Sequence, residues 1–292
     1  LGVEVLYGDF YKKNWRKWLK DHGDNIDFVY LNRACVSIKY IDFVKKFTDA
    51  KITYNAVDFS YLREQRQYEV SGDKQFLIAA ENSKKLEFDM FKKSDVIITI
   101  SEYEKDLLKE EMPKKKIHVI PTFIYDESRY GLTGGFFDRK DITFVGGFNH
   151  KPNVDGILWF VNEVFPGLRE ILPSIKLNVV GSNPPSEVLE LNADDINVTG
   201  FVSDEELKKY YECSRLVIAP LRFGAGVKGK IIEAIFYGTP VVTTKVGAEG
   251  IKEGEDIVSV GENEDQFMEN IVKIYNSERE WRRISSNETK YA

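Results

Sequence analysis

A glycine-rich loop followed by a short helical pattern carries the residues best suited to bind an anion. Gly224, Gly226 and Gly229 have no side chains, so the backbone of this loop can approach a ligand closely. Lys228 and Lys230 stand where the loop enters the predicted helix. Because a helix N-terminus has unpaired N–H groups and partial positive charge, we predict that this segment binds phosphate groups.

Glu233 follows about one turn later, near Lys230 on a helical wheel and away from the apolar face that includes Ile231 and Ile235. A carboxylate accepts hydrogen bonds from hydroxyl groups. The cluster therefore suits a sugar nucleotide, with the lysines and amides on the diphosphate and Glu233 on the ribose. A plainer interpretation is an i,i+3 surface pair between Lys230 and Glu233, and the sequence leaves it open.

Composition limits the class of protein. The chain has 292 residues, enough for two domains, and its 42% apolar and 30% charged residues are typical of a globular protein. A net charge of −6 argues against a nucleic-acid partner. Cys35 and Cys213 make neither a disulfide framework nor a metal site. With no apolar run long enough to span a bilayer, we expect a cytoplasmic protein, either free or at the inner face of the cell membrane.

Short β-branched runs alternate with amphipathic stretches, which favours parallel sheets covered by helices. The first series of predicted strands covers 3–6, 28–31, 52–54, 96–100 and 117–120. The second series covers 142–145, 177–180, 196–198, 216–219, 241–243 and 257–260. Helices are predicted over 153–172 and after Ser203, which forms a capping box with Glu206. The predicted domains are 1–130 and 141–292, joined by a linker at 131–140, with a ligand in the cleft between them at the carboxyl ends of the strands.

Two longer motifs resemble a known family. Residues 223–234 (Phe-Gly-Ala-Gly-Val-Lys-Gly-Lys-Ile-Ile-Glu-Ala), followed by Tyr-Gly-Thr-Pro-Val-Val at 237–242, resemble the donor-site motif of glycosyltransferase family 4. Residues 144–155 resemble the strand, loop and helix that open the C-terminal domain of that family. Weaker matches lie at 54–58 with 62–64, and at 100–102.

The resemblance implies an α/β protein of the GT-B fold, with two Rossmann-like domains whose parallel sheets face each other across a cleft. It implies a retaining glycosyltransferase whose C-terminal domain binds a UDP or GDP sugar and whose N-terminal domain binds a glycan, lipid-linked or protein-linked acceptor. Polysaccharide biosynthesis is the expected setting. Protein donors rather than a metal ion or another cofactor would stabilise the leaving diphosphate.

The resemblance also assigns roles to residues. Nucleotide-sugar binding falls to Gly146, Gly147, Asn153, Arg222, Gly226, Val227, Lys228, Lys230 and Glu233. Lys230 and Glu233 are also candidate catalytic residues, together with Asp58, which would orient an acceptor hydroxyl. Structural alternatives remain for several of them. The two glycines could only allow a tight turn, Asn153 could only cap a helix, Arg222 could lie at the cleft rim, and Asp58 could be a turn residue.

The sequence departs from the family pattern at several positions, including Val57 and Ser60 where histidines are common and Thr122 where an asparagine is common. Ala225 stands where many members have the first of two glutamates, and the chain resembles a subgroup with a Gly-Ala-Gly-x-Lys donor loop that also lacks this glutamate. The strand and glycine-rich loop that normally precede the element resembling residues 1–6 are missing, and the final crossing helix is short or absent, so we expect a truncated N-terminal unit. A nucleotide-sugar-binding fragment without transferase activity, or another GT-B enzyme such as a nucleotide-sugar epimerase, is therefore an alternative.

An aromatic and basic stretch near the N-terminus has helical spacing. Phe10, Tyr11, Trp15 and Trp18 recur on one side of the pattern. They are mingled with the cations Lys12, Lys13, Arg16, Lys17 and Lys20. The stretch is either a surface helix with one buried face or a peripheral attachment to an anionic membrane near a lipid-linked acceptor.

Overall fold

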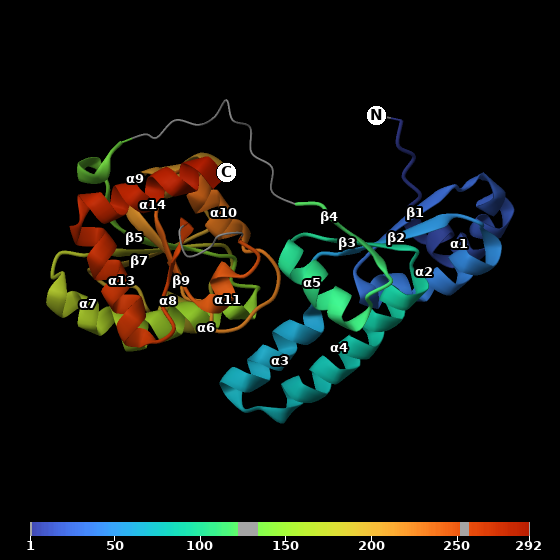
Figure 1. Ribbon diagram of the computed structural model, residues 1–292, viewed down its shortest axis with the longest axis horizontal. Coiled ribbons are helices and arrows are strands. Elements are labelled where there is room, and N and C mark those ends of the chain that lie inside the picture. The colour runs from blue at the N-terminus through green and yellow to red at the C-terminus, as the bar shows by residue number, and fades with distance from the viewer. Residues whose placement is uncertain (1, 122–133, 252–256, 292) are drawn as a thin grey trace. The chain divides into compact units, whose positions relative to one another are not determined.

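The computed structural model describes residues 2–121, 134–251 and 257–291. The chain divides into two compact units, which we call the N-terminal unit (residues 1–65 and 73–121) and the C-terminal unit (residues 66–72 and 122–292). Each unit is built on its own parallel sheet (Figure 1). The predicted α/β class, with parallel sheets in two domains, is therefore confirmed.

The N-terminal unit has a four-stranded sheet in which the strand order β1-β2-β3-β4 follows the chain. The strands are β1 (Phe28–Asn32), β2 (Lys51–Ala56), β3 (Val96–Thr99) and β4 (Lys116–Val119). The helices are α1 (Gly8–His22), η1 (Gly23–Asn25), α2 (Ala34–Phe47), α3 (Ser60–Ser71), α4 (Lys74–Lys93) and α5 (Glu102–Glu111). Helix α3 belongs to this unit as far as residue 65, and the rest of it belongs to the C-terminal unit. Four of the five predicted strands in this half are thus present.

Helices cover one face of this sheet. Side chains that alternate along β2, such as Ile52 and Tyr54, pack in one core with Ile41 of α2 and Phe91 of α4. Successive right-handed crossovers in a sheet whose strand order follows the chain place every helix on the same side. Among the described residues, the other face carries exposed or half-buried side chains such as Thr53.

The predicted strand at residues 3–6 is wrong. Residues 2–7 form no regular element, and Val3 and Val5 are 78% and 69% exposed. A β-branched run becomes a strand only where a neighbouring strand accepts its hydrogen bonds, and the described sheet pairs none with it.

Helix α1 packs part of its apolar side against α2, whereas Phe10 of the same helix is 67% exposed. The Trp15 ring lies edge-on to Tyr40 and Phe43 of α2, with ring centroids 4.8 Å and 5.2 Å away, and Leu19 is buried. The structure therefore forms the buried face expected of a surface helix, while membrane contact stays a prediction. Within residues 2–121, 134–251 and 257–291, no helix has the length and apolar character needed to cross a bilayer.

The C-terminal unit has a six-stranded parallel sheet in the order β10-β9-β8-β5-β6-β7. Its strands are β5 (Lys140–Val145), β6 (Leu177–Val180), β7 (Ile196–Gly200), β8 (Ser214–Ala219), β9 (Val241–Thr243) and β10 (Ser259–Val260). Its helices include α6 (Lys151–Trp159), η4 (Phe160–Val164), α7 (Phe165–Ile171), α8 (Ser186–Leu189), α9 (Asp204–Cys213), α10 (Gly229–Phe236), α11 (Lys245–Ala248), α13 (Glu264–Asn276) and α14 (Glu278–Tyr291).

Both faces of the second sheet are covered, which explains why its strands read as continuous apolar runs. Phe144 and Ile218 point into a core shared with α6, α7 and α13. Their neighbours Val145 and Val217 point the opposite way, into a core shared with α9 and α10. Residues from adjacent positions in β5 and β8 thus anchor two separate helical layers.

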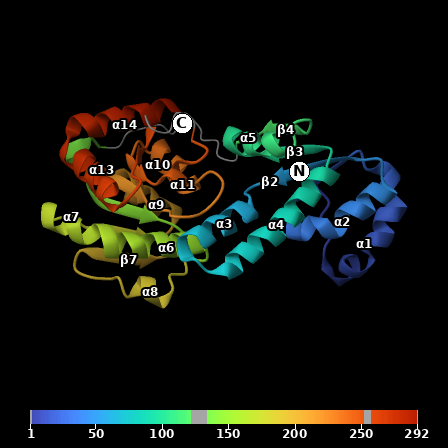
Figure 2. The same cartoon turned by 60° about the horizontal axis from the view of Figure 1, so that its bottom comes forward.

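The predicted helix over 153–172 is one continuous run of α6, η4 and α7, which lie in line in Figure 2. It begins two residues earlier than predicted, because Pro152 occupies its first turn, where a missing N–H costs nothing. The predicted capping box at α9 is present: Ser203 Oγ accepts from the Glu206 N–H, and Glu206 accepts from the Ser203 N–H.

Part of the predicted linker, residues 131–133, lies outside the described residues. Its described part contains the 3-10 turn η3 (Phe136–Asp138). Phe136 is buried, with its ring 6.2 Å from that of Trp281 in α14. Residues 136–138 therefore pack onto the core of the C-terminal unit.

Candidate functional site

The two glycine-containing loops of the sequence meet at one point of the C-terminal sheet. The chain runs from β5 outward through β6 and β7, then returns to β8 on the other side of β5 and continues outward to β9 and β10. Strands β5 and β8 are therefore neighbours where the direction of winding reverses. In open α/β sheets, ligands bind outside the carboxyl ends of the strands at such a switch point. The segments that follow β5 and β8, residues 146–150 and 220–228, contain most of the predicted site residues.

Lys230 and Asn153 bring these two segments together. The Lys230 Nζ atom donates a hydrogen bond to Asn153 Oδ1 at 2.5 Å, and Asn153 Nδ2 donates to the Gly147 carbonyl oxygen at 2.8 Å. A Cβ atom at Gly146 would stand 2.7 Å from both Lys230 Nζ and Asn153 Nδ2, so a side chain there would force these two groups to move. The structure thus joins Gly146, Gly147, Asn153 and Lys230, which are up to 84 positions apart in the 292-residue sequence.

Asn153 does not cap the helix. The N-cap of α6 is His150, and Asn153 lies in the first turn with a side chain that ties the loop to Lys230. The helix-cap alternative for Asn153 is therefore wrong, since Pro152 lets the helix begin before it.

The environment of Lys230 shifts the pKa of its ammonium group. Burial lowers the pKa of Lys230 to about 7, and the nearby positive charge of Lys228 acts in the same direction. The Asn153 oxygen and the face of the Phe144 ring, whose centroid is 4.6 Å from Lys230 Nζ, act the opposite way because both stabilise the ammonium form. A bound anion would stabilise the ammonium form of Lys230 and so raise its pKa.

The side chain of Lys228 forms a hydrogen bond within its own loop. Lys228 is the N-cap residue of α10, only 8% exposed, and its ammonium group donates to the Gly226 carbonyl oxygen. Gly226 has a φ of +72°, a conformation that a residue with a side chain rarely adopts. Val227 between them is half-buried. Gly226 and Lys228 therefore fix the shape of the loop at the N-terminus of α10, where the first N–H groups have no partner within the helix.

Glu233 is held by a residue that no motif indicated. The hydroxyl of Tyr211, in α9, donates to Glu233 Oε2 at 3.1 Å, and Tyr211 is fully buried. Burial raises the pKa of Glu233, while the Tyr211 hydrogen bond lowers it. Among the hydrogen bonds and ion pairs of the described residues, Lys230 and Glu233 form no direct pair, so the surface-pair interpretation is wrong. Sequence reasoning missed Tyr211 because only the fold brings α9 beside α10.

Two predicted residues are engaged in surface ion pairs. Arg222 is paired with Asp155, with 2.9 Å between Arg222 Nε and Asp155 Oδ2. Asp58, at the end of β2 in the N-terminal unit, forms an ion pair with Arg63 of α3. The prediction that Asp58 orients an acceptor hydroxyl stays a prediction, as do the assigned roles of the other site residues.

Acidic, histidine and cysteine side chains do not gather in threes anywhere in the described part of the chain in a way that could hold a metal ion. Whether transfer needs a metal stays a prediction.

Comparison with known proteins gives matches of two kinds. Residues 139–277 match the family model of "Glycosyl transferases group 1". A protein of Klebsiella pneumoniae, described as an uncharacterized 44.6 kDa protein in the cps region, is 33% identical over 141 residues, which cover 45% of this chain and 36% of that protein. The family-model match supports the glycosyltransferase prediction for this part of the chain.

Solved structures show the fold. TarM has a TM-score of 0.73 and 14% identity, and the match covers 95% of this chain and 55% of TarM. Anabaena Alr3699/HepE, solved in complex with UDP and glucose, has a TM-score of 0.65 and 14% identity over 98% of this chain and 78% of that one. This is the fold of GT-B glycosyltransferases. The chain spans about a third of the length of the Klebsiella relative and about half of TarM.

Proposed function

We propose that this chain is a retaining glycosyltransferase that transfers a sugar from a nucleoside diphosphate sugar to a glycan, lipid-linked or protein-linked acceptor. The observation that carries the proposal is the meeting of Gly146, Asn153 and Lys230 at the switch point of the C-terminal sheet. The cluster combines an ammonium group, a glycine whose backbone a ligand can approach, and the N-terminus of a helix.

In this proposal, Lys230 and the first N–H groups of α10 bind the diphosphate. Their charge stabilises the negative charge that grows on the leaving group as the sugar bond breaks. Glu233, fixed by Tyr211, accepts hydrogen bonds from the ribose hydroxyls. We propose UDP as the nucleotide, supported by the UDP in the similar HepE structure.

A thermal-shift screen against UDP, GDP, ADP and their sugars tests the donor class. A ligand that binds only the folded protein raises its melting temperature by mass action, so UDP should give the largest shift at equal concentration. No shift with any of the nucleotides would refute the proposed donor site.

Titration calorimetry with UDP tests the role of Glu233. We expect Glu233→Ala to weaken binding by about tenfold or more, because a charge-assisted hydrogen bond is lost. Glu205→Ala is the matched control, since Glu205 is an exposed carboxylate on α9. Equal affinities of the two variants would contradict the ribose assignment.

Binding without transfer is a second candidate, favoured by Ala225, which stands where many members of the resembled family have a glutamate. Product analysis after incubation with the donor, with and without an acceptor, separates the candidates. Transfer gives a product of retained anomeric configuration only with acceptor, an epimerase changes the donor alone, and a binding protein changes neither.

A further inference from the structure

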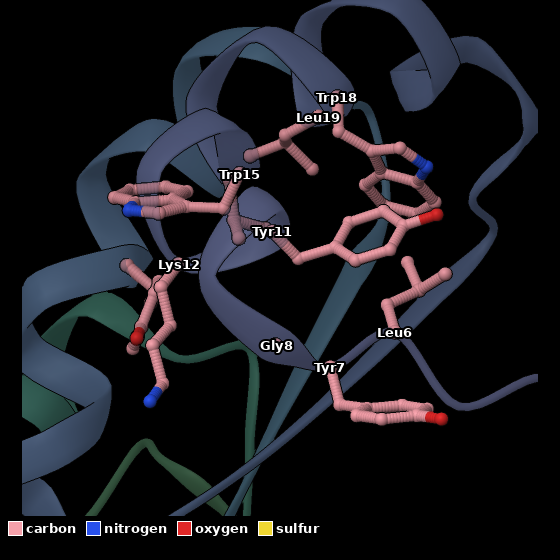
Figure 3. A pocket seen from close by; sticks show the side chains of 10 residues that line it. Leu6, Tyr7, Gly8, Tyr11, Lys12, Trp15, Trp18 and Leu19 are labelled. Carbon is pink, nitrogen blue, oxygen red and sulfur yellow. The ribbon is translucent and has the colours of Figure 1, made fainter.

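A pocket of about 510 Å³ lies in the N-terminal unit between α1 and α2 (Figure 3). Tyr11, Trp15 and Trp18 project into it from α1, and the buried side chains of Leu19 and Val44 lie behind them. Its volume falls in the range typical of small-molecule sites. None of the candidate residues of the C-terminal unit lines it.

Contacts with one another and with neighbouring side chains hold the aromatic walls of the pocket in place. The Trp15 ring packs edge-on against Tyr40, and the Arg16 guanidinium lies 4.7 Å from the centroid of the Trp15 ring. Trp18 stacks on the His22 ring with centroids 4.8 Å apart. Because these rings are fixed by neighbours, a ligand would not have to order them on binding.

The charge that lines the pocket has one sign. Lys12 is the one charged residue among those that line it, and no carboxylate does. Lys12 extends along one side of the pocket in Figure 3. The helix α1 that carries it has the cations Lys12, Lys13, Arg16, Lys17 and Lys20 against the carboxylates Asp9 and Asp21. The entrance therefore attracts anions.

We propose that this pocket binds a single lipid phosphate, with its hydrocarbon chain between the aromatic walls and its phosphate on Lys12. Aromatic and aliphatic side chains bury hydrocarbon favourably. Lys12 and the tryptophan N–H groups only donate, which suits an anion, and the hydroxyls of Tyr7, Tyr11 and Tyr40 can donate to it as well. An uncharged ligand would make no charged contact with Lys12.

The binding of a lipid phosphate is independent of the transfer reaction. Its use to hold the lipid part of an acceptor rests on the proposed function. A binding measurement on the pocket and a UDP titration on the same preparation therefore fail or succeed separately.

Tryptophan fluorescence of the whole chain, titrated with farnesyl monophosphate, tests the proposal, because Trp15 and Trp18 line the pocket. We expect saturable binding of one molecule per chain. Farnesol should bind at least about fivefold more weakly for lack of the charged contact, and inorganic phosphate should give no change. Equal binding of farnesol would overturn the phosphate assignment, and a non-saturable response would overturn the pocket.

Two neighbouring lysines provide a matched pair of variants. Lys12→Gln should raise the dissociation constant for farnesyl monophosphate by about fivefold or more, whereas Lys13→Gln, with the same charge change outside the pocket, should leave it within about twofold. Equal effects would show a general attraction to the basic helix and overturn the site. Leu6→Trp, placed in the irregular segment before α1, fills the pocket and should reduce the affinity of a folded protein by about tenfold or more. Full affinity in that variant would also refute the pocket.

Discussion

Replacing Lys230 by methionine removes a charge that the native fold disfavours and that a bound diphosphate would need. Burial lowers the pKa of Lys230 from 10.5 to about 7. Below about pH 7 the side chain is protonated in both the native and the unfolded chain, and the cost of the buried charge is complete. Between about pH 7 and 10.5 only the unfolded chain keeps the proton, so the free energy of unfolding rises with pH.

The size of this effect follows from the pKa. Each pH unit in that window adds up to about 1.4 kcal/mol to the free energy of unfolding of the wild type, or about 3 kcal/mol between pH 7 and pH 9. The Asn153 oxygen and the Phe144 ring stabilise the ammonium, so we expect about 1–2 kcal/mol. The free energy of unfolding of Lys230→Met does not rise in this way, because methionine carries no proton to lose. Its melting temperature relative to wild type should therefore fall by about 2–8 °C over this range.

The assay is thermal unfolding of wild type, Lys230→Met and Lys209→Met at about pH 6, pH 7.5 and pH 9. Lys209 is an exposed lysine of α9 and serves as the control for loss of a positive charge. We expect the melting temperature of Lys209→Met to follow that of the wild type at each pH. The melting temperature of Lys230→Met should fall relative to the wild type as the pH rises. Loss of the donor to Asn153 Oδ1 costs most at low pH, where the ammonium makes the stronger hydrogen bond, so it does not imitate this trend. Parallel curves for Lys230→Met and wild type would refute the reasoning.

Three further predictions concern single positions. Tyr211→Phe removes the hydrogen bond that lowers the pKa of Glu233. The fold should be retained, and the pH below which UDP binding weakens should move upward. An unchanged pH profile of UDP affinity would count against a positioning role for Tyr211. Gly146→Ala places a Cβ 2.7 Å from Asn153 Nδ2, so we expect a loss of about 1–3 kcal/mol in unfolding experiments and weaker UDP binding, whereas unchanged values of both would mean that the loop yields freely. Asp58→Asn should lower the rate of sugar transfer by about tenfold or more if this carboxylate orients the acceptor, and full activity in a transfer assay would remove Asp58 from the mechanism.

The sequence alone determined the class of fold and the position of the glycine-rich loop at a helix start. Alternating β-branched runs and amphipathic stretches predicted parallel sheets, because strand and helix periods are written locally in the chain. Gly226 and Lys228 were identifiable for the same reason, since a close turn and a helix start depend on residues a few positions apart.

Only the tertiary structure decided what these residues contact. The switch point between β5 and β8 brings Asn153 to Lys230, and the packing of α9 beside α10 brings Tyr211 to Glu233. The run at 3–6 failed as a strand for the same physical reason: its pattern is local, whereas pairing depends on a partner elsewhere in the fold. Contacts between distant residues, and the pKa shifts that burial produces there, follow from packing and not from the order of residues along the chain.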